Sequence, residues 1–337
     1  QGMEEMQNAK ESSEKMEKSL EEFSKKLKNK EKTDWNDKKE LDEFLERQKS
    51  YQDMMDKNTE KMMKNFDEMD DENNPLLEEK KEELKMRMEE MKAYKEKEQL
   101  IKELEKLAEK LEKEDLLERI DKLKEQSKQE KRTLERILEL TKQFYVEKKS
   151  AQIMKKLDEL SEEQLKLASE EINSAEEQEK LNKKFDSIQK DFDDMREQNE
   201  QLKSPLDIFD SKPDEKLIEM DMKAAEESLE EQAKKEEEQK KNMDKAKEKQ
   251  KTAAKRMKEL SKKMESGLLE MEMQGMEENI EDLQQVLKNL LKFSLDQEKV
   301  MLSFEDVSDK NADYPEKLKE QIMLKEYFEH IDDSLYA

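Results

Sequence analysis

Glycine and proline are scarce in this 337-residue chain, which holds three glycines and four prolines. No glycine occurs between Gly2 and Gly267, and the stretch between Pro75 and Pro205 contains neither residue. Because sheets and compact α/β folds use both residues at their turns, this scarcity argues against strands. We expect an all-α fold without a sheet, built from elongated coiled-coil helices and antiparallel helical hairpins.

Cysteine is absent, and histidine occurs once, at His330. The missing cysteines exclude disulfides, thiolate metal ligands and cysteine nucleophiles. The chain also lacks a Gly-rich phosphate loop, a G-x-S-x-G elbow and an H-E-x-x-H motif, and a lone histidine is typical of a surface or packing position. We therefore expect no enzymatic activity, no catalytic residue, no cofactor and no metal site.

Long apolar runs are also missing, so we expect no bilayer-spanning segment, which would need about 20 consecutive apolar residues. No signal peptide is visible, and the chain opens on Gln1 rather than on methionine. We expect it to be a piece of a longer polypeptide, with any membrane contact made by parts absent from this sequence.

Charge dominates what is present: 68 basic and 93 acidic residues give a net charge of −25. Opposite charges recur at helical spacing, as in Glu98 with Lys102 and Glu118 with Lys122, which favours helix over disorder. The acidic excess argues against a nucleic-acid partner, because a phosphate backbone requires Lys and Arg. The locally basic stretch Lys251–Lys263 is interpreted as a solvated helix face.

Residues 1–74 predict an N-terminal helical hairpin. One apolar stripe indicates a helix from Met3 to Lys30, and a second indicates a helix from Asp37 to Asp71 that ends before Pro75. Asp37 followed by Glu40 resembles an N-cap signal. Trp35, just before it, is expected to act as a hydrophobic staple or as an aromatic plug between the two helices.

Residues 75–204 predict long coiled-coil helices, because leucines recur three and four residues apart. The phase slips between Leu111 and Leu116. The pattern is consistent with one uninterrupted rod or with two or three antiparallel helices. We favour the latter, with turns near 127–131 or 169–174. Ser161 and Ser174 resemble helix starts. The seam, internal or oligomeric, comprises Leu100, Leu104, Leu107, Leu111, Leu116, Ile120, Leu123, Leu134, Ile137 and Phe144. The apolar run 144–146 predicts the thickest packing.

Residues 205–214 form a predicted loop, residues 215–310 a second long-helix segment, and residues 311–337 a short C-terminal helix. We expect one helix from Pro213 to about Ser266, followed by the widest apolar face of the chain. That face is wide enough for two neighbouring helices, so we expect it to bind a partner. Its residues are Ile280, Leu283, Val286, Leu287, Leu290, Leu291 and Phe293.

Methionine is abundant, with 23 residues. Two groups resemble the thioether clusters that bind Cu(I): Met86, Met88 and Met91, and Met271, Met273 and Met276. The simpler interpretation is that methionine fills irregular helical seams. Methionine-rich stripes are also typical of surfaces that repack against varied partners.

Three strings carry a resemblance to a known family. They are Glu135–Glu147 (ERILELTKQFYVE), the stretch from Met276 to Phe304, and Glu326–Leu335 (EYFEHIDDSL). These resemble segments of large Bacteroidota envelope proteins of the family called domain of unknown function 4175. The resemblance implies membrane-spanning helices followed by an extracytoplasmic helical region, of which this chain would be an excerpt. It implies a location in the cell envelope, on the periplasmic side of the inner membrane, and supplies no catalytic residues.

Two functions are consistent with these features. The first is a non-enzymatic, elongated helical scaffold of a larger envelope protein, which contacts other protein chains (a second copy or envelope complex subunits) through coiled-coil pairing. The alternative is a methionine-rich periplasmic adaptor or holdase chaperone that binds unfolded or secreted client proteins.

Overall fold

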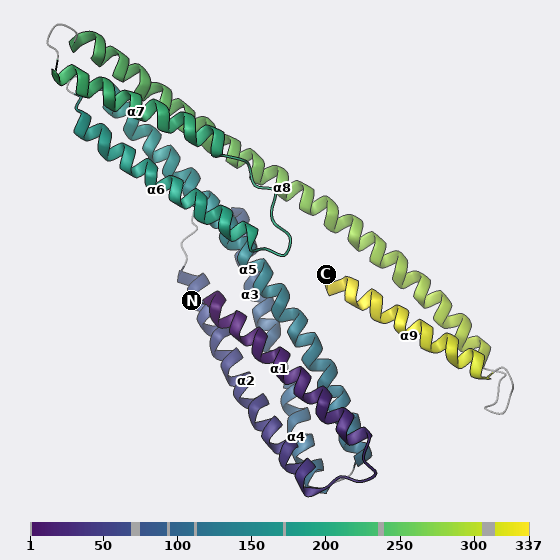
Figure 1. Cartoon of the computed structure of the whole chain (residues 1–337). Helices are drawn as coiled ribbons and strands as arrows, with labels where there is room; N and C mark the ends of the chain where they lie inside the picture. Colours follow the sequence, from purple (N-terminus) through teal and green to yellow (C-terminus); the bar gives the residue numbers. More distant parts are fainter. Residues whose placement is uncertain are drawn as a thin grey trace. The chain divides into compact units, whose positions relative to one another are not determined.

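The computed structural model describes residues 2–68, 75–92, 95–110, 113–170, 173–234, 239–304 and 314–336. Within these ranges the chain forms nine α-helices and no strand, which confirms the all-α fold (Figure 1). It divides into two compact units, Gln1–Gly267 and Leu268–Ala337. We call them unit 1 and unit 2. The boundary between them lies inside the predicted segment 215–310.

The first half of unit 1 is a helical bundle. It contains α1 (Gly2–Lys28), α2 (Trp35–Glu68), α3 (Pro75–Lys92), α4 (Lys95–Lys110) and the beginning of α5 (Lys113–Ser169). The helix α1 packs against α2 and α5, while α3 and α4 each pack against α2 and α5. Each helix thus buries its narrow apolar stripe against neighbouring helices.

The second half of unit 1 is another bundle, which contains the end of α5, α6 (Ala175–Glu200), α7 (Lys212–Lys234) and the beginning of α8 (Gln239–Phe304). These four segments share one apolar core. Phe144 belongs to the core of the first bundle and Val146 to the core of the second, so the dense run 144–146 marks where α5 passes from one core to the other (Figure 1).

Unit 2 is a two-helix hairpin made of α8 from Leu268 onward and α9 (Tyr314–Tyr336). The rings of Phe293 and Phe328 lie with centroids 4.9 Å apart, and those of Phe304 and Tyr314 lie 5.8 Å apart. These contacts fix the register of α9 along α8. Gly275 lies within α8 without interrupting it.

The central helices turn at one of the two predicted places. The chain leaves α5 at Ser169 and enters α6 at Ala175, which confirms the turn near 169–174. The turn near 127–131 is wrong, because α5 continues through Ser127 and Glu130, which are buried among the neighbouring helices. The described part of residues 75–204 forms four helices, α3 to α6, so the favoured number of two or three is wrong, and α4 ends at Lys110, next to the predicted phase slip.

The single helix expected from Pro213 to Ser266 is also wrong. The helix α7 ends at Lys234 and α8 begins at Gln239, with no glycine or proline near the break. Both helices bury their apolar stripes in the second bundle, with Ile218 and Met222 on α7 and Met257 on α8. Because the apolar stripes of α7 and α8 are buried in the same core, two packed helices are favoured over one long solvated helix.

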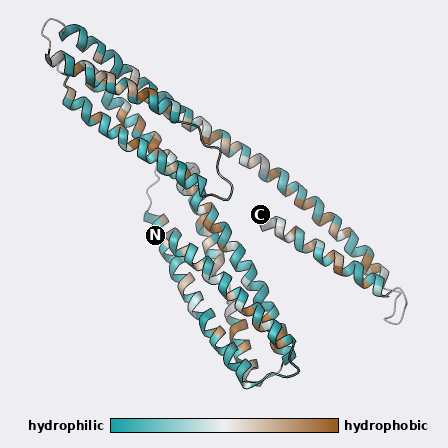
Figure 2. Cartoon of the chain, viewed as in Figure 1, coloured by the Kyte–Doolittle hydropathy of each residue, from teal (hydrophilic) through white to brown (hydrophobic). Residues whose placement is uncertain are grey.

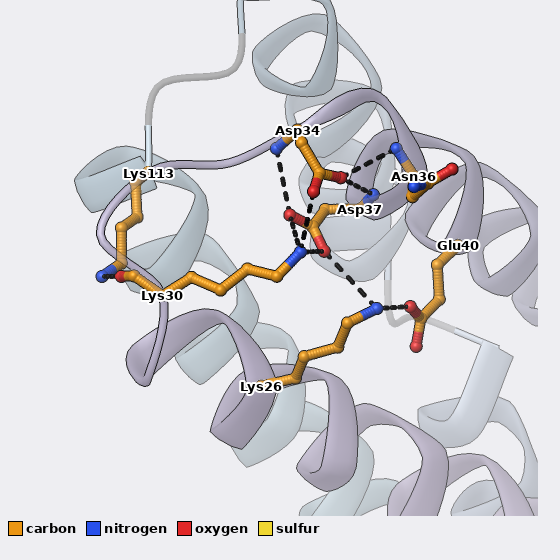
Figure 3. A network of polar contacts seen from close by, with 7 residues as sticks. All are labelled: Lys26, Lys30, Asp34, Asn36, Asp37, Glu40 and Lys113. Atoms are coloured by element: carbon orange, nitrogen blue, oxygen red, sulfur yellow. Dashed lines mark hydrogen bonds and ion pairs between the residues drawn. The ribbon is translucent and has the colours of Figure 1, made fainter.

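The start of α2 is a reciprocal capping arrangement, shown in Figure 3. The Asp34 carboxylate accepts from the backbone N–H groups of Asn36 (2.9 Å) and Asp37 (3.0 Å). In return, the Asp37 carboxylate accepts from the Asp34 N–H (3.0 Å). Asp34 is therefore the N-cap and Asp37 its partner at the third helical position, so the prediction of Asp37 as the cap is wrong. Trp35 is 69% exposed, so it is neither a staple nor a plug.

Lysines from α1, from the connection between α1 and α2, and from α5 complete this network. Lys30 Nζ donates to both oxygens of the buried Asp37 carboxylate (2.7 and 2.8 Å), Lys26 pairs with Glu40, and Lys113 donates to the Lys30 carbonyl (Figure 3). Burial alone would raise the pKa of Asp37, but the Lys30 ammonium and the Asp34 N–H outweigh it and hold that pKa below its ordinary value. The network thus joins α1, α2 and α5 at one end of the first bundle.

Of the two serine helix starts, one is observed. Ser174 caps α6 by accepting from the Glu177 N–H (3.3 Å). Ser161 lies inside α5, where its hydroxyl is buried and donates to the Ala254 carbonyl of α8 (2.9 Å), so the start predicted there is wrong. A serine that bonds to a neighbouring helix is thus not distinguished from a cap by local sequence alone.

Candidate interaction surface

The C-terminal part of α8 carries two apolar seams, each with residues three and four positions apart. The inward seam faces α9. Val286 and Val300 are its most buried members, Phe293 contacts the Phe328 ring, and the Gln297 and Gln321 side-chain amides exchange hydrogen bonds of 3.2 and 3.3 Å. Its members are Val286, Leu290, Phe293, Gln297, Val300 and Phe304. One neighbouring helix therefore covers this seam.

The outward seam is the second stripe of α8, and its side chains are 49–67% exposed. Its spacing of four and three residues is the a and d pattern of a coiled coil, and one step of four from Leu287 to Leu291 shifts the phase. Figure 2 shows apolar residues recurring along this part of α8. The outward seam comprises Leu269, Met273, Met276, Ile280, Leu283, Leu287, Leu291, Leu295 and Leu302.

The outward seam extends beyond the reach of α9. In the hairpin Phe304 meets Tyr314, Gln297 meets Gln321, and Phe293 meets Phe328. At the same register Ile331, near the end of α9, lies level with about residue 287 of α8. No part of α9 lies alongside the first four outward residues, Leu269 to Ile280. Leu318, Ile322, Met323 and Phe328 add exposed apolar surface on α9 itself.

Charges beside the outward seam are divided along its length. Residues 268–282 contain six acidic and no basic residues, whereas residues 283–304 contain three lysines and two acids. Lys292 lies 5.7 Å from the centroid of the Tyr327 ring, and Lys299 bonds to Asp296 (2.9 Å). That hydrogen bond holds the pKa of Asp296 below its ordinary value. The seam is thus acidic at its beginning and mildly basic towards its end.

The structure splits the seven predicted partner-binding residues between the two seams. Ile280, Leu283, Leu287 and Leu291 are exposed on the outward seam, while Val286, Leu290 and Phe293 belong to the inward seam. Sequence reasoning did not assign Leu269, Leu295 and Leu302 to this surface, although the same spacing continues through them. The role of the exposed residues in binding a partner stays a prediction.

The predicted coiled-coil seam lies inside the first bundle. Leu100, Leu104, Leu116, Ile120 and Leu123 are buried at one end, and Leu134, Ile137 and Phe144 are buried further along α5. Leu107 is partly buried, and Leu111 lies outside the described residues. These leucines are used by the chain's own helices, and the described ones leave no broad exposed seam for a second chain.

A cluster of amide side chains buried in unit 1 has its partners within the chain. In the second bundle the side-chain amides of Gln164 and Gln178 bond to each other (2.7 and 3.0 Å). Gln250 donates to Gln178 (2.9 Å), and Asn173 donates to Gln250 (2.7 Å). When buried amide groups bond to one another, they fix the helices that carry them. Few of their donors and acceptors are then left to bind a ligand.

Ion pairs in the same bundle also connect its own elements. Asp221 on α7 pairs with Lys249 and Arg256 on α8, both at 2.9 Å. Arg196 on α6 pairs with Glu215 on α7 (2.8 Å) and also bonds to Ser211 (3.0 Å). A shallow groove on α2 is lined by Ser50, Asp53, Met54, Lys57, Asn58, Glu60, Lys61 and Lys64. It lacks the convergent buried groups of an active site.

The methionine groups and His330 do not converge on a shared site. Met88 and Met91 are buried in the first bundle while Met86 is exposed, and Met273 and Met276 belong to the outward seam. His330 is exposed on α9. Among the described residues, no group of three or more histidine, aspartate or glutamate side chains is arranged to hold a metal ion. None of the helices in the described part of the chain has an apolar stretch of the length that a membrane span requires.

Comparison with known proteins adds no relative. No family model, no curated protein and no solved structure matches this chain. The resemblance to the domain of unknown function 4175 family thus stays a prediction.

Proposed function

We propose that this chain is a non-enzymatic helical scaffold module that binds another protein through the outward seam of unit 2. The observation that carries the proposal is the contrast in coverage. The leucine seams of unit 1 are buried by neighbouring helices, while the nine large apolar side chains of the outward seam remain about half or more exposed. Contiguous exposed apolar surface of this kind marks sites of protein association.

The periodicity of the seam favours a helix as the bound element. Its a and d spacing matches the way helices pack knobs into holes, and pairing with a helical partner buries the whole stripe. From the resemblance noted in the sequence we also propose that the module belongs to a larger cell-envelope protein and faces the periplasm. Membrane attachment would then come from segments outside this sequence.

The experiment is site-specific photo-crosslinking in cells of the source organism. A photoreactive amino acid replaces Leu287 on the outward seam, and in a control it replaces Leu165, an exposed leucine of α5. We expect discrete protein adducts at Leu287 and few at Leu165. Equal labelling at both positions, or no protein adduct at Leu287, would contradict the proposal.

An adaptor or holdase chaperone is the second candidate. The observation that favours it is the exposure of Met273, Met276, Met301 and Met323, all in unit 2, since flexible thioether side chains adapt to varied partners. A holdase would suppress the aggregation of an unfolded client protein, and it would give many diffuse adducts at Leu287. A scaffold would do neither.

A further inference from the structure

We propose that the occupant of the outward seam is a second copy of this chain, with the two α8 helices antiparallel across a twofold axis near residues 285–286. This inference rests on the proposed function, because it names the partner of the same surface. Three independent features of α8 support it: the register of its apolar residues, the order of its charges and the angle between its two seams.

The apolar register is self-complementary when α8 is reversed on itself. With the twofold axis placed between residues 285 and 286, Leu269 meets Leu302 of the second copy, and Met276 meets Leu295 of the second copy. Ile280 then meets Leu291 of the second copy, and Leu283 lies beside Leu287 of the second copy. Each contact pairs an a position with a d position, as antiparallel coiled coils require. A C2 interface uses the same patch on both copies, and this seam meets that condition.

The phase shift between Leu287 and Leu291 is part of this match. A straight α-helix drifts relative to a strict seven-residue repeat, and an inserted step of four compensates for the drift. Because the shift lies close to the twofold axis, the beginning of the seam in one copy faces the end of the seam in the other. Three of the pairs, Leu269 with Leu302, Met276 with Leu295 and Ile280 with Leu291, are then equidistant from the axis, and the distances of Leu283 and Leu287 from it differ by one residue.

The charges select the antiparallel direction. On one side of the seam Glu270 and Glu281 lie in the acidic half, while Lys288 and Lys299 lie in the other half. In the register set by the apolar pairs, Glu281 faces Lys288 of the second copy and Glu270 faces Lys299 of the second copy. A parallel pair would place the six acidic residues of 268–282 beside the same six of the second copy, and like charges at such positions oppose pairing.

The geometry of unit 2 leaves room for this arrangement. At about 100° per residue, the outward and inward seams lie roughly 100° apart around α8, so a second α8 and the chain's own α9 occupy different sides of the helix. The reversed partner also places its own α9 beside the half of α8 that α9 of the first copy does not reach.

The area is sufficient for a specific interface. Full burial of a side chain of this size removes roughly 60–120 Å² of apolar surface, so nine side chains at about 60% exposure present about 300–650 Å² per copy. Apolar atoms make up roughly 65% of a homodimer interface, which implies a total of about 900–2,000 Å² for the pair. Specific interfaces bury about 1,200–2,000 Å², so we expect a reversible dimer of moderate affinity.

The first test measures the mass of the full chain by sedimentation equilibrium over a range of concentrations. We expect a shift from 40.5 kDa towards twice that mass. Leu283→Asp should weaken association at least about 100-fold, because it places a charge at the centre of the interface, and circular dichroism checks that it stays helical. Leu165→Asp, on the exposed face of α5, is the matched control and should leave the mass unchanged. A monomer at every concentration, or a dimer indifferent to Leu283→Asp, would overturn the proposal.

A charge exchange tests the direction. Glu281→Lys and Lys288→Glu should each weaken the dimer by about 3–10-fold, and the double variant should restore it, because the exchanged charges again face one another across the axis. In a parallel pair residue 281 does not face residue 288 of the second copy, so the double variant would not be rescued. Absence of rescue contradicts the antiparallel register.

Because the natural chain has no cysteine, single-cysteine variants can map the same register. Gln284→Cys lies next to the axis and should form a disulfide with itself, which requires Cα atoms about 4.4–6.8 Å apart. Met276→Cys should not link to itself but should link to Leu295→Cys when the two variants are mixed. Self-linking at position 276 would indicate a parallel pair and overturn the proposal. Crosslinks in cells to a different protein, with no self-association, would refute the second copy as occupant and leave the proposed scaffold function intact.

Discussion

Units 1 and 2 both carry apolar residues spaced three and four positions apart, but the two units differ in how far these residues are buried. In unit 1 the leucines of α5 contact helices on several sides, so Leu123 and Ile137 are fully buried. In unit 2 the helix α8 has two seams and one neighbour, α9. The comparison shows that an apolar stripe identifies a helix face that can be buried. The number of neighbouring helices decides whether that face is buried within the chain.

The largest expected effect comes from truncating one leucine in each unit. Leu123→Ala, in the first bundle, should lower the free energy of unfolding by about 2–5 kcal/mol, because it removes fully buried methyl groups and leaves a cavity. Leu291→Ala, on the outward seam, should change it by less than about 0.5 kcal/mol when the chains are dilute. Urea unfolding followed by circular dichroism measures both.

Chain concentration sharpens that comparison. If two copies associate as proposed, the cost of Leu291→Ala should grow as the protein is concentrated, while that of Leu123→Ala should stay constant. Equal costs for the two variants in dilute solution would mean that the seam is covered within a single chain.

A smaller effect is expected at the network that begins α2. Asp37→Asn should lower the free energy of unfolding at pH 7 by about 1–2 kcal/mol, because the buried carboxylate loses its charged hydrogen bond from Lys30. The folded-state pKa of Asp37 lies below its ordinary value of 3.8. Its contribution is therefore present above pH 3.8 and is lost as pH falls through the lower folded-state pKa.

The difference between wild type and Asp37→Asn should accordingly shrink as the pH is lowered below about 3.8. Denaturant unfolding at pH 7, 5 and 3 measures it. Asp53→Asn, at an exposed position on the same helix, is the control and should cost less than about 0.5 kcal/mol at pH 7. A constant difference for Asp37→Asn at all three pH values would show that its charge does not stabilise the fold.

The smallest effect concerns Gly275, in the part of α8 that belongs to unit 2. A Cβ at this position meets no atom within 4 Å, so Gly275→Ala should stabilise the helix by about 0.5–1 kcal/mol through helix propensity alone. Thermal unfolding of the α8–α9 hairpin measures it. Gly267→Ala, where a Cβ would lie 3.5 Å from the Phe209 Cβ, is the companion in unit 1. A loss of stability at Gly275 would indicate that another element approaches the helix there.

Several features of the fold could be predicted from the sequence. The scarcity of glycine and proline indicated helices, and the Leu100–Leu123 spacing identified residues that are buried in the first bundle. Ser174 with Glu177 located the start of α6, because a cap is a local interaction between nearby residues.

Other features depend on contacts between distant residues. The ends of α4 at Lys110 and of α7 at Lys234 have no glycine or proline near them. The packing of α4 on α5, and of α7 and α8 in one core, depends instead on residues distant in the sequence. Asp34 was missed as the cap of α2 because Asp37, three residues later, has the same chemistry and carries the return bond. The division of Ile280–Phe293 into inward and outward residues depends on the position of α9, which local spacing does not encode.

The 57-residue helix α5 has a consequence for how the chain is made. During synthesis, α1 and α2 emerge from the ribosome long before the helix that completes their bundle: the bond between Lys113 and the Lys30 carbonyl spans 83 residues. Until α5 is made, the apolar side chains of α1 and α2 that it covers remain exposed to water. Once α5 is complete, its far end presents apolar residues, among them Ile153 and Leu157, against which α6, α7 and α8 pack.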